Sequence, residues 1–428
     1  MIKKLIYLNL VLAITLNWFT KNPSILTHGF SYLDILPKQA FGIVEVISIL
    51  IFLGILPYLS KQKVFILPLA LLIGYLAVSL PYTLIWDGKI VHFIIGVRSY
   101  VSFIPIFYGG YYLSQKGYSI KPYVILILIL SLIQLPVTIF QYVFSLTLLK
   151  RAGTQYDVIA GTMGGLAGNL MSILLSSTAL VLIYFYFKYK KKIILIGIAS
   201  LIIPSILAEA KGVFIILFFG LSYFLIAGNL KVNRKIGLIF ISIFLFTFLS
   251  FLYVSFIGLE RDVLDPEYYV EYENKKNFRE DGRVARYTSL ILATELIASK
   301  PPGLVFGLGL GNAAKNNLVG QDGPFYSFFT VLHFWDRFII ETGFFGVFVV
   351  FFLIIKSIMM LKYVEKKSND KFLSVLAGGM TAVMFVSIIA GVYTDHFNRV
   401  QYSYPLALII GYIYSEYLKI KKVSRRSN

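Results

Sequence analysis

The chain of 428 residues contains no cysteine, only four histidines and a small share of charged residues. Without cysteine there is neither a disulfide nor a thiolate metal site. Charged residues make up 14% of the chain, whereas soluble domains carry about 25%. Hydrophobic residues make up 58%, more than the core of a soluble protein of this length can bury. The composition therefore predicts a membrane protein and excludes a soluble one.

Long apolar runs recur along the chain, each of roughly 17–25 residues and therefore long enough to cross about 30 Å of hydrocarbon. They predict an all-α polytopic membrane protein with about 12 transmembrane helices and one large external loop between the ninth and tenth helices. The predicted spans are 4–20, 41–59, 64–85, 91–114, 120–146, 159–187, 192–209, 212–230, 235–257, 337–361, 372–394 and 402–420. The fourth contains Gly109-Gly110 and the sixth contains the glycine-rich stretch 161–168, which we expect to break or shorten the helix.

Basic residues give the chain a formal net charge of +19 and lie mainly at the ends of the apolar runs. Just over half of the 40 Lys and Arg residues lie in the two termini and in one set of alternating loops, which predicts that both termini are cytoplasmic. Their placement favours contact with anionic membrane lipids over nucleic-acid binding. The predicted parts are helices one to nine (1–257), the external loop (258–336), helices ten to twelve (337–420) and a basic cytoplasmic tail (421–428).

The external loop carries its own local signals. Apolar positions at helical spacing predict an amphipathic helix over 284–299 that lies on the membrane bundle, with Asp281 as its N-cap. Pro301 and the proline after it end this helix. The Gly-x-Gly-x-Gly run at 307–311 lacks the preceding strand of a nucleotide-binding loop and predicts a tight turn instead.

Ionisable residues at the predicted external ends of the spans are the candidates for function, because a charge at membrane depth is costly and tends to be functional. These residues are Arg98, Arg151, Glu209, Lys211, Arg283, Arg286, His333, Arg337, Glu341, Asp395 and Arg399. Most are basic, and guanidinium groups bind phosphate oxygens in bidentate fashion, so the set suits a phosphate or pyrophosphate ligand. Alternatively, most of these side chains snorkel or pair with lipid headgroups.

Three of the candidates follow a helical spacing. His333, Arg337 and Glu341 are at i, i+4 and i+8, so they share one face if the helix begins that early. Such a face would offer a base, a phosphate clamp and a carboxylate, and histidine accepts protons near neutral pH. Alternatively, Arg337 and Glu341 form a structural ion pair and His333 lies at the membrane interface. No set of His, Asp and Glu has the spacing of a metal site, so we expect neither a metal nor another cofactor.

The order of these features resembles the O-antigen ligase and polymerase superfamily of bacterial membrane glycosyltransferases. The positions that carry the resemblance are Gly282-Arg283 at the start of the loop helix, Pro301-Pro302 followed by Gly307-Leu308-Gly309, His333, the run Glu341-Thr342-Gly343-Phe344-Phe345-Gly346, Lys211-Gly212 at the start of the eighth helix, and 162–169 at the start of the sixth. Three features depart from the pattern. Arg is commoner than Lys at 211, Phe334 replaces the usual polar residue after the histidine, and His333 lies one residue closer to Glu341 than in the common pattern.

The resemblance implies a GT-C-like fold and a polymerase of O-antigen or capsule repeat units. Such an enzyme transfers a glycan from an undecaprenyl-pyrophosphate carrier to a sugar hydroxyl on the external face of the bacterial inner membrane, without metal or nucleotide. Lys211 and Arg283 would neutralise the pyrophosphate, and His333, or else Glu341, would act on the hydroxyl. The other implied ligands of pyrophosphate or glycan are Arg98, Arg151, Arg286, Arg337 and Arg399. A chain-length regulator and a flippase are the implied protein partners.

Two alternatives stay open at this point. An O-antigen ligase would use the same chemistry to transfer the glycan to lipid A core, and the sequence barely separates it from a polymerase. A transporter or flippase of lipid-linked oligosaccharide would share the number of helices and could use basic residues to carry its anionic substrate. Transporters concentrate ionisable residues near the bilayer midplane, for which Glu45 is a candidate, whereas most polar candidates here lie at one external face.

Overall fold

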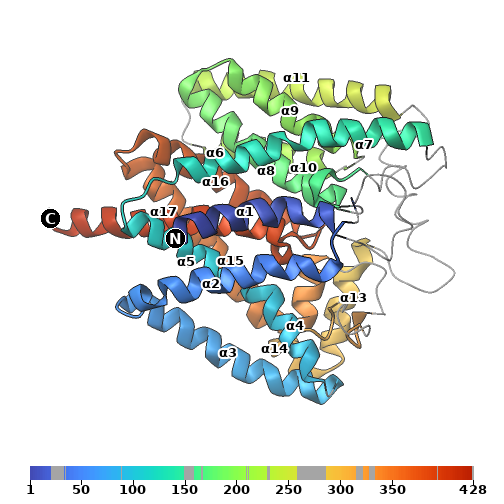
Figure 1. Ribbon diagram of the computed structural model, residues 1–428, viewed down its shortest axis with the longest axis vertical. Coiled ribbons are helices and arrows are strands. Elements are labelled where there is room, and N and C mark those ends of the chain that lie inside the picture. Colours follow the sequence, from blue (N-terminus) through green and yellow to red (C-terminus); the bar gives the residue numbers. More distant parts are fainter. Residues whose placement is uncertain are drawn as a thin grey trace.

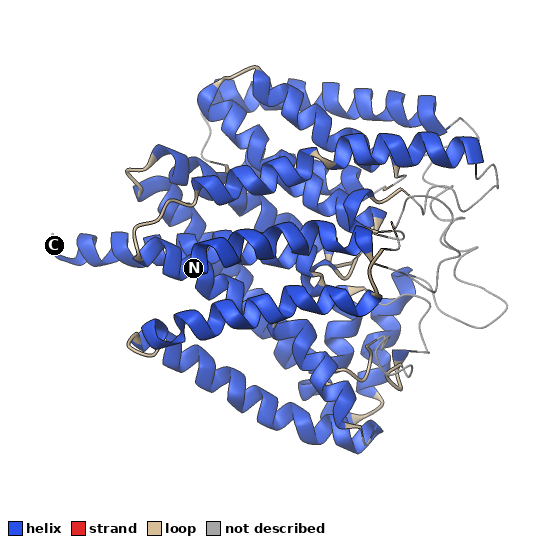
Figure 2. Cartoon of the chain, in the orientation of Figure 1, coloured by secondary structure: helices blue, strands red, loops and turns tan. Residues whose placement is uncertain are grey.

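A computed structural model gives the fold of the chain and describes residues 1–20, 33, 35–87, 89–148, 159–164, 167–208, 210, 212–228, 232–257, 286–314, 322–326, 333–392 and 394–426. Within these ranges the protein is all-α and contains no β-strand, apart from an isolated bridge between Thr20 and Leu36 (Figure 2). The α-helices are α1 (Ile2–Phe19), α2 (Gly42–Leu59), α3 (Lys63–Asp87), α4 (Ile90–Val101), α5 (Ile104–Gln115), α6 (Lys121–Leu132), α7 (Gln134–Leu148), α8 (Gly168–Tyr189), α9 (Ile193–Leu207), α10 (Gly212–Ala227), α11 (Val232–Ile257), α13 (Arg286–Ala298), α14 (Pro301–Phe306), α15 (Phe334–Lys367), α16 (Lys371–Ala390) and α17 (Val400–Arg426).

The long helices run side by side, and the two chain ends lie at the same end of the bundle (Figure 1). Seven helical stretches within the described ranges are long and apolar enough to cross a membrane. They are Ile2–Phe19, Gln39–Leu59, Ile90–Gln115, Lys121–Val143, Gly168–Tyr189, Phe334–Lys367 and Lys371–Ala390. The prediction of an all-α membrane protein is confirmed, whereas the number of 12 spans stays a prediction.

The fourth predicted span is interrupted, but its glycines are not the cause. Helix α4 ends at Val101 and α5 begins at Ile104, with Pro105 in the first turn of α5. Proline has no backbone N–H to donate to the preceding turn, which explains the break at this point. Gly110 instead lies inside α5, where a Cβ atom would come within 2.1 Å of the Leu408 carbonyl of α17. On α17, a Cβ atom at Gly411 would come within 1.9 Å of the Phe107 carbonyl, so glycines on both helices allow their close approach.

The sixth predicted span begins later than its apolar pattern indicates. Helix α8 starts at Gly168, and the preceding residues form a single 3-10 turn, Gly161–Met163. Gly161 and Gly164 have φ angles of 58° and 84°, a conformation that glycine adopts without steric cost. The predicted start at residue 159 is therefore wrong, because this glycine-rich stretch turns the chain before the helix.

A helix is present where the sequence predicts one, as α13, at the end of the bundle away from both chain ends (Figure 1), whereas its place in an external loop stays a prediction. Its buried residues Ala293 and Ile297 form one apolar cluster with Ile339 and Ile340 of α15. Helix α13 ends at Ala298, before the two prolines, which begin the short helix α14. Proline is favoured at the first helical position, so the same residues end one helix and start the next. Asp281, the predicted N-cap, lies outside the described residues.

Candidate functional site

The first turns of α15 are buried although they carry several polar side chains. His333 is the N-cap residue of this helix and is 2% exposed. The Asp336 carboxylate accepts hydrogen bonds from the His333 backbone N–H at 3.1 Å and from the Ser289 hydroxyl of α13 at 2.7 Å. One oxygen of this carboxylate also lies 3.1 Å from Nδ1 of the His333 ring. In the tautomer that donates from Nδ1 to this carboxylate, Nε2 of the ring keeps its lone pair.

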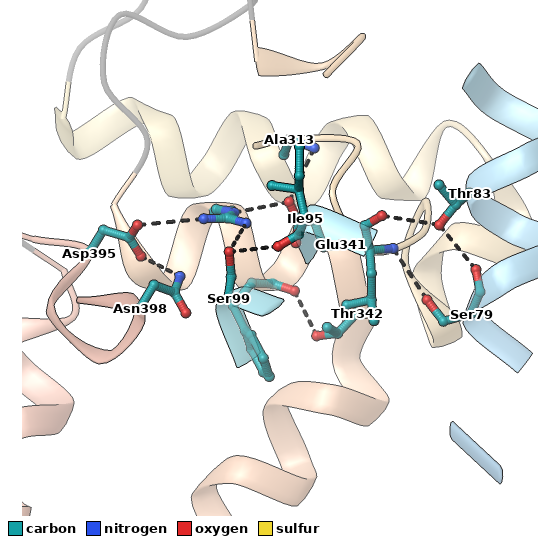
Figure 3. A network of polar contacts seen from close by, with 12 residues as sticks. Ser79, Thr83, Ile95, Ser99, Ala313, Glu341, Thr342, Asp395 and Asn398 are labelled. Atoms are coloured by element: carbon teal, nitrogen blue, oxygen red, sulfur yellow. Dashed lines mark hydrogen bonds and ion pairs between the residues drawn. The ribbon is translucent and has the colours of Figure 1, made fainter. Parts of the chain in front are cut away.

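The guanidinium of Arg337 joins three parts of the chain. Its Nε donates to Glu341 at 3.0 Å, and a terminal nitrogen donates to the Ser99 hydroxyl of α4 at 3.1 Å. The other terminal nitrogen lies 3.6 Å from the Asp395 carboxylate, in the connection between α16 and α17. The guanidinium carbon lies 5.5 Å from the centre of the Tyr100 ring. Figure 3 shows Ser99, Glu341 and Asp395 in this network. Together these contacts hold the Arg337 side chain, which is only 9% exposed.

Glu341 is fully buried and uses one of its two carboxylate oxygens within the described residues. Oε1 accepts from Arg337 and from the backbone N–H of Ala313, which is 3.2 Å away. Oε2 has no hydrogen-bond partner among the described residues, and neither do the hydroxyls of Tyr75 and Tyr100. Both tyrosines are close enough to interact electrostatically with the Glu341 carboxylate. Buried polar atoms are normally satisfied, and the Tyr100 hydroxyl is the group closest to serving as a partner of this carboxylate.

The glycine run at 307–311 forms the tight turn that its sequence predicts and contacts a break in α15. Gly307, Gly309 and Gly311 have φ angles of 77°, 97° and 87°. The backbone N–H of Leu308 donates to the Ile340 carbonyl at 2.7 Å, next to the break in α15 at Gly343, where φ is 62° and ψ is −169°. A Cβ atom at Gly343 would come within 2.5 Å of the Gly307 nitrogen, so this contact requires glycine.

The other side of this turn lies against α3 and α4. The Thr83 hydroxyl of α3 donates to the Leu310 carbonyl at 3.1 Å, and the Leu310 N–H donates to the Ser79 hydroxyl at 3.2 Å (Figure 3). A Cβ atom at Gly311 would come within 1.7 Å of the His92 carbonyl of α4. The turn therefore occupies the space between α15 and the pair α3 and α4, and it places the Ala313 N–H on Glu341.

The predicted site residues separate into two groups among those that the structure describes. His333, Arg337, Glu341 and Asp395 lie in the buried region at the start of α15. Arg98 lies apart from their contacts and is 2.6 Å from Glu45 of α2, with side chains 41% and 23% exposed. Glu45 is in the first turn of α2, so its charge lies at a helix end. Arg399 is exposed and directly precedes α17.

Several predicted residues lie outside the described part of the chain. They are Arg151, Glu209, Lys211 and Arg283. Arg286 is the first residue of α13, and its side chain is not described. The proposed pyrophosphate ligands Lys211 and Arg283 therefore stay predictions from the sequence alone.

Sequence reasoning missed three residues of the buried network as candidates. Asp336 follows His333 by three positions, the spacing of an N-cap and N3 residue, so a capping pattern could have indicated it. Ser99 and Tyr100 belong to α4 and reach Arg337 only through the tertiary fold. Nothing in their local sequence predicts that contact.

The connection between α16 and α17 adds two titratable groups, the half-buried Asp395 and the fully buried His396. Desolvation raises the pKa of the Asp395 carboxyl, although the positive charges of Arg337 and Arg399 oppose this shift. Burial lowers the pKa of His396 to about 3. The His396 ring is fully buried between the rings of Phe397 and Tyr402, with centroids 4.2 and 5.0 Å away, so it is held in the neutral form.

Within the described residues, no group of three or more His, Asp and Glu side chains is placed to hold a metal ion. No protein-family model matches the chain, and no match is found among curated protein sequences. The resemblance to the O-antigen ligase and polymerase superfamily therefore rests on the sequence motifs alone.

Proposed function

We propose that the chain is a polymerase of O-antigen or capsule repeat units, which acts on an undecaprenyl-pyrophosphate-linked glycan at the external face of the bacterial inner membrane. The observation that carries this proposal is the oriented histidine at the start of α15, whose Nδ1 faces Asp336. The site is next to α13, at the end of the bundle opposite to both chain ends (Figure 1). If the basic termini are cytoplasmic, as their charge predicts, this site faces outward.

In the proposed reaction, Nε2 of His333 takes the proton of the acceptor sugar hydroxyl, and Asp336 stabilises the imidazolium that forms. The hydroxyl oxygen then bonds to the anomeric carbon of the donor sugar, and the bond from that carbon to the pyrophosphate oxygen breaks. The carrier leaves as undecaprenyl pyrophosphate. Arg283 and Lys211 stabilise the charge that develops on it.

Arg337 and Glu341 have a positioning role in this proposal. The guanidinium already contacts Glu341, Ser99 and Asp395, so the ion-pair alternative fits its surroundings better than a phosphate clamp. Through these contacts the pair fixes the turn that follows His333 on α15.

The test is a gel of surface polysaccharide from cells that lack this protein. The cells are complemented with wild type, Arg283→Ala, His333→Ala or the control Arg425→Ala, an exposed residue in the last turn of α17. We expect single repeat units on the lipid core in the null strain and with the first two variants, and a full ladder with wild type and Arg425→Ala. Immunoblots must show equal amounts of protein.

Other outcomes of the same gel reassign the function. Polymer that accumulates on the carrier while the core stays bare identifies a ligase. Loss of all surface glycan, with lipid-linked repeat units retained on the cytoplasmic side, identifies a flippase. A full ladder with both Arg283→Ala and His333→Ala at normal expression shows that the proposed site is wrong.

A further inference from the structure

A second region, separate from the polar site, is an apolar groove within the helix bundle. Its volume is about 220 Å³, and its walls come from α6, α8, α9, α16 and α17. Representative lining residues are Val124, Leu128, Phe185, Ile194, Phe372 and Leu406. The groove therefore lies between helices that we expect to be surrounded by lipid.

The polar groups in the groove wall have partners within the protein. The Thr178 hydroxyl donates to the Leu174 carbonyl at 2.9 Å. The Tyr402 hydroxyl lies 2.7 Å from the Ser387 hydroxyl and 3.4 Å from that of Ser177. Because these groups are satisfied, the interior of the groove suits a chain without polar atoms.

One end of the groove is surrounded by lysines. Lys121 is the first residue of α6, Lys192 is the N-cap of α9 and Lys371 is the first residue of α16, and all three are exposed. Each lies within three residues of a lining residue, namely Val124, Ile194 and Phe372 respectively. Three helices therefore begin at this end of the groove, and their N-terminal dipoles add to the positive charge of the lysines.

The nearest acidic group on these helix ends does not neutralise the lysines. The Asp370 carboxylate accepts hydrogen bonds from the backbone N–H groups of Phe372 and Leu373, at 2.8 and 3.2 Å. It caps α16 and forms no ion pair within the described residues. Within the described residues none of Lys121, Lys192 and Lys371 forms an ion pair either.

We propose that this groove binds an anionic phospholipid, with one acyl chain between α6, α8, α16 and α17 and its phosphate at Lys121, Lys192 and Lys371. The apolar wall matches an acyl chain, and the three lysines match a negatively charged headgroup. The site is at the basic end of the bundle, away from His333 and Arg337. It does not depend on the proposed glycosyl transfer.

The first test compares lipids of equal chain length and different charge. Purified protein in detergent is titrated with phosphatidylglycerol or phosphatidylcholine, and thermal unfolding and native mass spectrometry measure binding. We expect phosphatidylglycerol to raise the unfolding temperature more than phosphatidylcholine does and to remain bound in the mass spectrometer. Equal shifts by the two lipids would overturn the proposal.

Matched charge variants locate the headgroup. In the test variant Lys121, Lys192 and Lys371 are changed to Gln; in the control Lys4, Lys61 and Lys422, exposed residues outside the groove, are changed to Gln. Both lose three charges, so a general effect of net charge affects them equally. We expect the test variant to lose the preference for phosphatidylglycerol and the control to keep it. Retention of the preference in the test variant would contradict the assignment.

The acyl chain is located by filling the groove. Leu128→Trp adds a large ring to its wall, and we expect at least a tenfold weaker retention of phosphatidylglycerol in native mass spectra. Unchanged retention would contradict binding in the groove. If Leu128→Trp does not fold, competition decides instead. A polyprenyl phosphate that displaces phosphatidylglycerol at equal concentration identifies an isoprenoid lipid as the occupant and overturns our choice of a phospholipid.

Discussion

Arg337 and Glu341 lie one turn apart on α15, with Nε of the arginine 3.0 Å from the carboxylate, and both side chains are buried. Removing one member of a buried ion pair leaves an uncompensated charge, which costs about 3–5 kcal/mol. We expect Arg337→Ala, which leaves the fully buried Glu341 carboxylate without its cation, to lower the free energy of unfolding in detergent by this amount. Arg98→Ala, which breaks the partly exposed pair with Glu45, is the control and should cost about 0–1 kcal/mol. Equal losses would show that burial does not decide the strength of these pairs.

A second prediction concerns the hydrogen bond that orients His333. Asp336→Asn keeps the shape of the side chain and an acceptor oxygen, but it removes the negative charge that stabilises the imidazolium in the proposed reaction. We expect the rate of polymerisation by purified protein to fall about 10²-fold or more, the smaller end of what a general base contributes. Ser289→Ala removes only the hydroxyl that α13 donates to Asp336 and should reduce the rate far less. A normal rate with Asp336→Asn would exclude a role for the charge of Asp336 in the reaction.

The buried His396 predicts a dependence of stability on pH. Its pKa is about 3 in the folded protein and 6.5 in the unfolded chain, so the unfolded chain binds the proton more tightly. The stabilisation by neutral His396 is complete above pH 6.5 and is lost as the pH falls toward 3, by up to about 1.4 kcal/mol per pH unit. Unfolding temperatures of wild type and His396→Phe, measured at pH 7.5, 6 and 5, check this. The difference between the two should shift in favour of the variant at lower pH, and a constant difference would contradict it.

The glycine turn predicts unequal effects of two alanine substitutions. Gly311 and Gly117 both have positive φ angles, 87° and 71°, but a Cβ atom at Gly311 would be 1.7 Å from the His92 carbonyl while Gly117 faces open space. Gly117→Ala should cost about 1 kcal/mol through backbone strain alone. We expect Gly311→Ala to cost more than twice as much in thermal unfolding, because the turn must leave α4. Similar costs would show that the turn can move without loss.

The sequence predicted features that depend on local rules. Apolar length predicted the all-α membrane class, helical spacing predicted the helix α13, and the Gly-x-Gly-x-Gly run predicted the turn. It misplaced features that depend on neighbours in space. Gly110 looked like a helix breaker, yet it allows α17 to pack closely on α5. The partners of Arg337 also come from α4 and from the connection before α17, so no local pattern predicts them.

The break at Gly343 divides α15 into two helical parts, and the direction of the side chains in one part does not follow from that in the other. In an uninterrupted helix each residue turns the chain by about 100°, so an inserted or deleted residue would rotate every side chain on one side of it. At Gly343 the backbone leaves the helical conformation, and the Ile340 carbonyl accepts its hydrogen bond from Leu308 instead. The polar turns from His333 to Thr342 and the apolar turns after Phe344 therefore keep separate rotational registers. A residue can therefore be inserted or deleted in the part of α15 after Phe344 without turning His333 and Arg337 away from their partners.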